Sequence, residues 1–115
     1  MHVSKDLMAA SATPLVLSLL QHNDSYGYEL ISKVRTLSDG QLEWKEGMLY
    51  PLLHRLEKNG LIESYTEALA NGRRRKYYRL LPKGRESLVE QRSTFKQVAE
   101  FLDLAAHPTP GVNHA

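Results

Sequence analysis

Four consecutive cations, Arg73, Arg74, Arg75 and Lys76, form the densest cluster of charge in the sequence. They follow Gly72 directly. Neighbouring like charges repel one another unless an anion neutralises them, and a nucleic-acid backbone does so while it releases counterions. The alternative is a solvated surface loop without a partner. The cluster is therefore a candidate phosphate-binding segment.

A candidate DNA-reading helix precedes this cluster. Its leucines, Leu49, Leu52, Leu53 and Leu56, recur at the spacing of one helix face. If that face is buried, the remaining surface carries the predicted DNA contacts, which are Lys45, Met48, Tyr50, Pro51, His54, Arg55 and Lys58. An α-helix fits the major groove of DNA, where Arg and Lys can bind guanine edges. The alternative is an ordinary amphipathic surface helix.

The basic residues are concentrated in the middle of the chain. Residues 45–92 hold eleven Lys and Arg against six Asp and Glu, whereas residues 1–44 hold three and five, and residues 93–115 hold one and two. The net charge of the whole chain is only +2. A localised basic region of this kind is typical of proteins that bind a polyanion.

Three helices are predicted before the basic cluster. The first comprises a short lead-in over residues 5–10 and a main part that is capped by Thr13, with Pro14 at its first position. The second is capped by Ser25 and reaches Leu37. An extended piece is expected over residues 41–45. The third helix runs from Gly47 to the Asn59-Gly60 stop signal.

The pattern then changes to a hairpin and one last helix. Strands are predicted over residues 61–67 and 75–81, and Asn71-Gly72 favours the turn between them. The last helix is predicted over residues 83–105. The fold class is therefore mainly α with a small β-hairpin, arranged as a winged helix-turn-helix with a C-terminal dimerisation helix.

An apolar stripe on the last helix predicts a homodimer. Leu88, Phe95 and Leu102 lie seven residues apart, which is typical of a helix that packs on another helix. The predicted dimer interface comprises Leu7, Met8, Leu88, Phe95, Val98, Ala99 and Leu102. We divide the chain into a DNA-binding domain (1–82), a dimerisation helix (83–106) and a disordered tail (107–115).

Several function classes are excluded or disfavoured. The absence of cysteine excludes disulfides and thiolate chemistry. The histidines lack metal-ligand spacing, and we find neither a catalytic constellation nor a phosphate-binding loop, so an enzyme, a metal and a cofactor are not expected. No apolar run is long enough to span a membrane, and we expect a soluble, cytoplasmic protein.

Three blocks of the sequence resemble the signature blocks of the PadR family. They are YGYEL at residues 26–30, GMLYPLLHRLEKNGLI at residues 47–62, and GRRRKYYRL at residues 72–80. The resemblance covers about residues 5–104 and implies a winged helix with one C-terminal dimerisation helix. It also implies a regulator of transcription, typically a repressor, that binds double-stranded DNA. Some members respond to small aromatic or drug-like molecules bound near the dimer interface.

Two positions depart from the family pattern. Met48 stands where a small hydroxyl residue is common, which removes a potential hydrogen bond to DNA. Leu81 stands where threonine is usual, and its side chain cannot cap the last helix. Two other functions remain open: a winged-helix module that contacts an acidic protein, and a helical dimer that binds a small molecule without a role in DNA binding.

Overall fold

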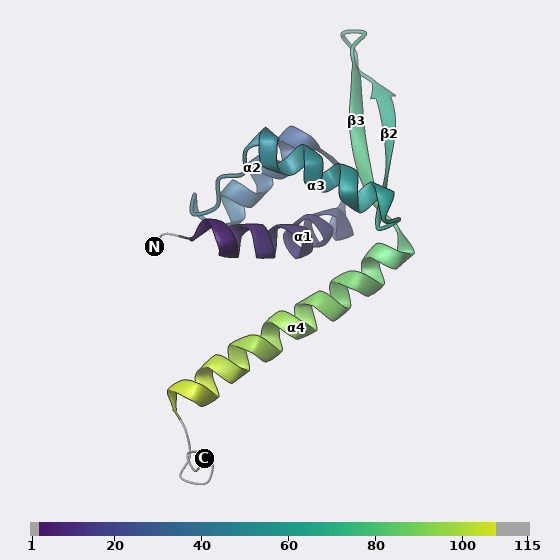
Figure 1. The fold of residues 1–115 in the computed structure, drawn as a ribbon. Coiled ribbons are helices and arrows are strands. Elements are labelled where there is room, and N and C mark those ends of the chain that lie inside the picture. Colours follow the sequence, from purple (N-terminus) through teal and green to yellow (C-terminus); the bar gives the residue numbers. More distant parts are fainter. Residues whose placement is uncertain (1–2, 108–115) are drawn as a thin grey trace.

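The computed structural model describes residues 3–107 of the chain. Its elements are α1 (Lys5–His22), β1 (Ser25–Tyr26), α2 (Gly27–Leu37), α3 (Glu46–Lys58), β2 (Ile62–Ala68), β3 (Arg74–Leu80) and α4 (Pro82–Ala106). Helices α1 to α3 form a small bundle with α2 and α3 above α1, the β2–β3 hairpin projects from it, and α4 extends away beneath α1 (Figure 1). The predicted architecture, mainly helical with a small hairpin, is confirmed.

The core lies between the first three helices and the base of the hairpin. The leucine face of α3, comprising Leu49, Leu52, Leu53 and Leu56, is buried as predicted. It packs with residues that include Leu17 of α1, Leu30 of α2 and Ile62 of β2. Burying one face fixes the direction of the other, so the opposite face of α3 is turned toward solvent.

The first helix differs from the prediction. It is one continuous helix, whose N-cap is Ser4 and not Thr13, and the Ser4 hydroxyl accepts a hydrogen bond from the Leu7 amide at 3.2 Å. Pro14 lies inside the helix and is buried. Apolar residues on both sides of Pro14, including Ala12 and Val16, are buried together. Their packing outweighs the single backbone hydrogen bond that proline cannot donate.

The start of the second helix also differs from the prediction. Ser25 does not cap α2 but forms the short strand β1 with Tyr26, and α2 begins at Gly27. Ser25 is completely buried, and its hydroxyl accepts a hydrogen bond from Lys33 Nζ at 2.8 Å. A strand of two residues is too short to produce a sequence period. Residues 41–45, which were expected to be extended, form no strand.

The three strands form one antiparallel sheet in the order β1-β3-β2. Tyr26 lies opposite Tyr77 of β3, and Tyr65 of β2 lies opposite Tyr77 on the other side. The predicted hairpin is confirmed, with its turn at Gly72, which has a φ of 84°. The Leu69 amide closes the tip by donating to the carbonyl of Arg73 at 2.7 Å.

The last helix begins one residue earlier than expected, with Pro82 in its first turn and Leu81 as an N-cap without a side-chain bond.

The molecule measures 67 × 31 × 21 Å, and its radius of gyration is 17.6 Å. A compact domain of about 100 residues has a radius of gyration of about 13 Å. The difference arises because most of α4 extends beyond the core. The predicted disordered tail falls largely on residues 108–115, outside the described residues.

Candidate DNA-binding surface

The exposed face of α3 has a centre and two flanks. Successive residues of an α-helix are 100° apart, so Gly47, Pro51, His54 and Lys58 lie opposite the leucine face, and all four are exposed. Lys45, at the N-cap, is also exposed. Three residues of this central row, Pro51, His54 and Lys58, are among the predicted DNA contacts, and they are the part of α3 that a groove in the duplex would meet first.

Met48 and Arg55 lie on one flank of α3. They line a shallow pocket with Pro51 and with Ala9 and Ala12 of α1. Met48 is half-buried, whereas Arg55 is exposed. Arg55 therefore lies at the edge of the exposed face and not in its central row.

Tyr50 lies on the other flank, against the start of α2. Its ring packs over Gly27, and a Cβ at Gly27 would overlap the Tyr50 hydroxyl and lie 2.7 Å from its Cζ. Glycine therefore permits this close approach, and a larger residue at Gly27 would displace the Tyr50 ring from the backbone. Burial, followed by the charge of Glu46, raises the pKa of Tyr50. A tyrosine hydroxyl is protonated at neutral pH in any case, and it can donate to a phosphate.

The start of α2 is held next to the start of α3. A hydrogen bond to Glu46 is the main cause that raises the pKa of Tyr28. The N-cap of α2, Tyr26, makes no side-chain cap bond to the amides of the first turn. Such amides, at the positive end of the helix dipole, are suited to an anion.

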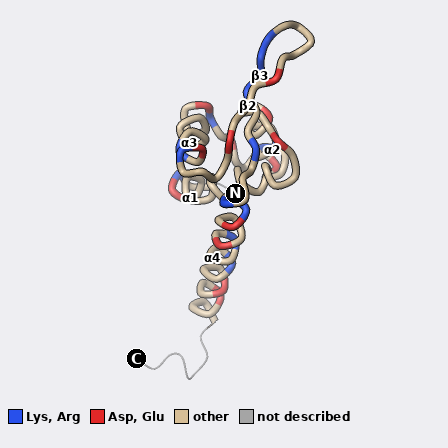
Figure 2. Tube along the Cα trace, turned by 90° about the vertical axis from the view of Figure 1, so that its right-hand side faces the viewer, with Lys and Arg blue, Asp and Glu red and all other residues tan. Residues whose placement is uncertain are grey.

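The β2–β3 hairpin, residues 62–80, is the wing of this fold, and its cations Arg74, Arg75 and Lys76 divide between the two faces of β3. Successive side chains of a strand point to opposite faces, so Arg74 and Lys76 share the face of Tyr78, which is buried toward the helices. Arg75 belongs to the other face. Figure 2 shows these cations close together at the tip end of the hairpin, beyond the helices.

Arg75 is engaged with aromatic side chains. Its guanidinium carbon lies 4.0 Å from the centroid of the Tyr26 ring. A hydrogen bond with the Tyr77 side chain raises the pKa of Arg75 further above its ordinary value. Arg74 instead donates a hydrogen bond from Nη2 to the Thr66 hydroxyl at 2.8 Å, and both residues of that pair are exposed.

A groove brings the helix and wing contributions together. Its volume is about 360 Å³, and it lies between the start of α2 and the wing. It is lined by Tyr26, Gly27, Tyr28, Tyr50, Leu69, Arg73, Arg74, Arg75, Lys76 and Tyr78. Tyrosine hydroxyls and cations on one concave surface provide donors and positive charge for a phosphate backbone.

The predicted dimer residues fall into two groups. Leu88 is only 2% exposed and belongs to the core of its own chain, so it leaves little surface for a partner. Leu7, Phe95, Val98, Ala99 and Leu102 are exposed, and Met8 is partly buried. The structure thus separates the first residue of the α4 stripe from the rest, because only the beginning of α4 packs against the core.

Other kinds of site find no support in residues 3–107. In that range no three His, Asp or Glu side chains are grouped so that they could hold a metal ion. Nor does any helix described there have the length and hydropathy needed to cross a membrane.

The three helices, the small antiparallel sheet and the projecting basic hairpin define a winged-helix DNA-binding protein. Residues 16–90 match the model of the transcriptional regulator PadR-like family. The chain belongs to this family, and its members are transcriptional regulators and not enzymes, as predicted.

Individual relatives agree with this assignment. A transcriptional regulator from Clostridium thermocellum has a TM-score of 0.81 at 34% identity, over 88% of this chain and 95% of that one. A PadR-like regulator from Bacillus cereus has a TM-score of 0.76 at 28% identity, over 91% and 100%. Transcriptional regulator Rv3488 of Mycobacterium tuberculosis is 45% identical over 62 residues, 53% of this chain and 57% of that protein.

Sequence reasoning missed the contribution of Tyr26, Gly27 and Tyr28 to the groove. These residues were recognised only as part of a family block, without a role. The signal was present in the pattern, because a glycine between two tyrosines at a helix start favours close backbone packing. Which side chain fills the space above Gly27 could not be predicted, since Tyr50 lies 23 positions later.

Proposed function

We propose that this protein is a repressor that binds an inverted-repeat operator as a homodimer. The observation that carries the proposal is the groove in which Tyr50 of α3 and the wing cations line one surface. A helix placed in the major groove beside a wing on the adjacent backbone is the expected docking mode of this fold. Two such units related by a two-fold axis would read two half-sites.

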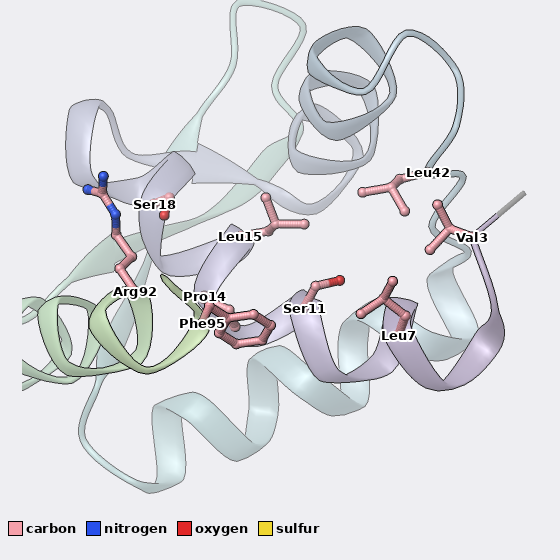
Figure 3. A pocket seen from close by; sticks show the side chains of 9 residues that line it. All are labelled: Val3, Leu7, Ser11, Pro14, Leu15, Ser18, Leu42, Arg92 and Phe95. Carbon is pink, nitrogen blue, oxygen red and sulfur yellow. The ribbon is translucent and has the colours of Figure 1, made fainter. Parts of the chain in front are cut away.

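The second protomer is supported by an unpartnered apolar surface. A groove of about 470 Å³ lies between α1 and α4 and is lined mainly by apolar side chains, with Leu7, Leu15 and Phe95 among them (Figure 3). Beyond it, Val98, Phe101 and Leu102 are 50%, 55% and 67% exposed along α4. A soluble monomer rarely exposes so large an apolar surface, so a second copy is the expected cover.

A small-molecule effector is part of this proposal. The α1–α4 groove also contains Ser11, Ser18 and Arg92, whose polar groups could orient an aromatic compound that carries an acceptor or an anionic group. A compound bound there would alter the angle between α1 and α4 and thereby the spacing of the two reading helices. Release from DNA would then follow from a changed half-site spacing.

The decisive experiment is a gel shift with DNA from upstream of the gene itself. We expect a discrete complex that survives an excess of random duplex and loses affinity steeply as salt rises. Binding that is equal on operator and random DNA would contradict a specific repressor. Failure to bind any DNA, with retention of an acidic protein partner, would favour the winged-helix interaction module instead.

A further inference from the structure

We propose that Arg75 is a positioning residue, which fixes the wing against the helices through Tyr26, while its neighbours Arg74 and Lys76 contact DNA. The inference rests on the proposed DNA contact of the wing. It divides one run of cations into two functions that the sequence does not distinguish.

The first observation is a ladder of cations and rings on the outer face of the sheet. The Tyr26 ring meets Tyr77 edge to face at 5.5 Å, and Tyr77 stacks on Tyr65 at 5.7 Å. Arg75 covers one end, 4.0 Å from the Tyr26 centroid, and Arg79 covers the other, 4.6 Å from the Tyr65 centroid. Together these five side chains connect all three strands.

The end of the ladder at Arg79 is fixed to the body of the protein. Arg79 forms ion pairs with Glu63 at 2.9 Å and with Asp24 at 3.5 Å. The Tyr65 hydroxyl donates a hydrogen bond to Asp24 Oδ2 at 2.6 Å. Asp24 directly precedes β1, so these contacts hold the base of the wing against the segment that leads into α2.

The second observation is that β3 extends further toward the tip of the hairpin than its neighbour β1 does. β1 pairs only with Tyr77 and Tyr78, so on that edge no strand accompanies the tip residues 74–76 in the described structure. From there to the tip the wing is a two-stranded ribbon, which is marginally stable alone. Arg75 reaches back across this edge to Tyr26, the N-cap of α2. A planar guanidinium that stacks on a ring is well suited to such a brace.

The third observation is the direction of the neighbouring cations. Arg74 and Lys76 belong to the face that continues into the buried Tyr78 and Leu80, whereas Arg75 belongs to the ladder face. Lys76 Nζ lies 5.6 Å from the Tyr78 centroid and is exposed. Arg74 donates only to the exposed Thr66 hydroxyl, so both Arg74 and Lys76 keep solvent-exposed charge on the face that includes Tyr78, whereas Arg75 is half-buried although it lines the same groove.

The test compares two charge-matched variants, Arg74→Met and Arg75→Met, by the salt dependence of operator binding. Loss of a phosphate contact should lower the magnitude of the slope of log K against log salt by about 0.9 for each wing. We expect that change for Arg74→Met. For Arg75→Met we expect the wild-type slope with about two- to fivefold weaker binding per wing, which corresponds to a lost cation–π contact.

A double-mutant cycle with Tyr26→Leu provides the second readout. We expect Arg75→Met to cost almost nothing further once Tyr26 is absent, whereas Arg74→Met should add its full effect. Amide hydrogen exchange of residues 74–76 should accelerate in Arg75→Met, and thermal melts should show that each variant remains folded.

The outcomes separate the two proposals. A slope that falls equally in Arg74→Met and Arg75→Met, or full additivity of Arg75→Met with Tyr26→Leu, would show that Arg75 contacts phosphate and would overturn the inference. An Arg75→Met variant with wild-type affinity would overturn it too. If neither methionine variant changed affinity or slope, the DNA contact of the wing itself would be wrong.

Discussion

Gly84, in the first turn of α4, lies against the backbone carbonyl of Leu61 so closely that a Cβ at this position would overlap the carbonyl oxygen. The Leu80 Cδ1 atom would lie 2.6 Å from the same Cβ. Two further contacts join these segments: the Leu81 amide donates to the Leu61 carbonyl at 3.0 Å, and Lys83 Nζ donates to the Asn59 carbonyl at 3.0 Å. The proposed dimer helix is thus packed directly onto the short segment that joins α3 to β2.

Gly84→Ala should therefore destabilise the protein. The added methyl group must displace backbone and not a flexible side chain, and overpacking of this kind costs about 1–3 kcal/mol. Urea unfolding followed by circular dichroism measures the change. Gly47→Ala is the matched control, because nothing lies within 4 Å of a Cβ there and alanine favours a helix over glycine. Equal stability of both variants and wild type would contradict the packing at Gly84.

Tyr50→Phe should weaken DNA binding without altering sequence preference. The variant keeps the ring that packs over Gly27 but loses the hydroxyl that faces the groove. A lost hydrogen bond of this kind is worth about 0.5–1.5 kcal/mol, and a phosphate contact carries no direct base information. Fluorescence anisotropy on operator and random duplexes should show similar losses on both. A loss confined to the operator would instead indicate base reading.

His54→Ala and Arg55→Ala should have different effects on specificity. His54 lies in the central exposed row of α3, whereas Arg55 lies on the flank beside Ala9 and Ala12. Base contacts are worth about 1–3 kcal/mol of discrimination. In a binding selection from randomised duplexes, we expect His54→Ala to change the selected motif and Arg55→Ala to lower affinity uniformly. The opposite result would place base reading on the flank, where Met48→Thr should then change the motif as well.

Phe95→Asp should produce monomers. Phe95 lines the α1–α4 groove and is 42% exposed in the isolated chain, so a partner is expected to bury it. Burial of a charge without a partner costs several kcal/mol. Sedimentation equilibrium at micromolar concentration is the measurement. Ser93→Asp adds the same charge on the opposite side of α4 and should leave a dimer. A wild-type monomer at that concentration would show that the dimer proposal is wrong.

The sequence alone determined the elements whose signal is local. The leucine spacing of α3, the Asn71-Gly72 turn and the strand residues around Tyr77 and Tyr78 are each contained within a few positions, and the structure confirms the helix and hairpin that they predict. The family blocks are likewise read from the sequence, and residues 16–90 match the family model. Periodicity of this kind states which residues share a face.

Periodicity does not state which residues pack against a given face of a helix or strand. Those packing partners are set by the tertiary structure alone. Arg74 and Arg75 are chemically identical neighbours, yet only the pairing of β1 with β3 places Tyr26 beneath Arg75. Leu88 and Phe95 belong to one stripe, yet α4 leaves the core after its first turns, so the first is buried and the second is exposed. Such contacts join residues far apart in the chain, and only the packing of whole elements sets them.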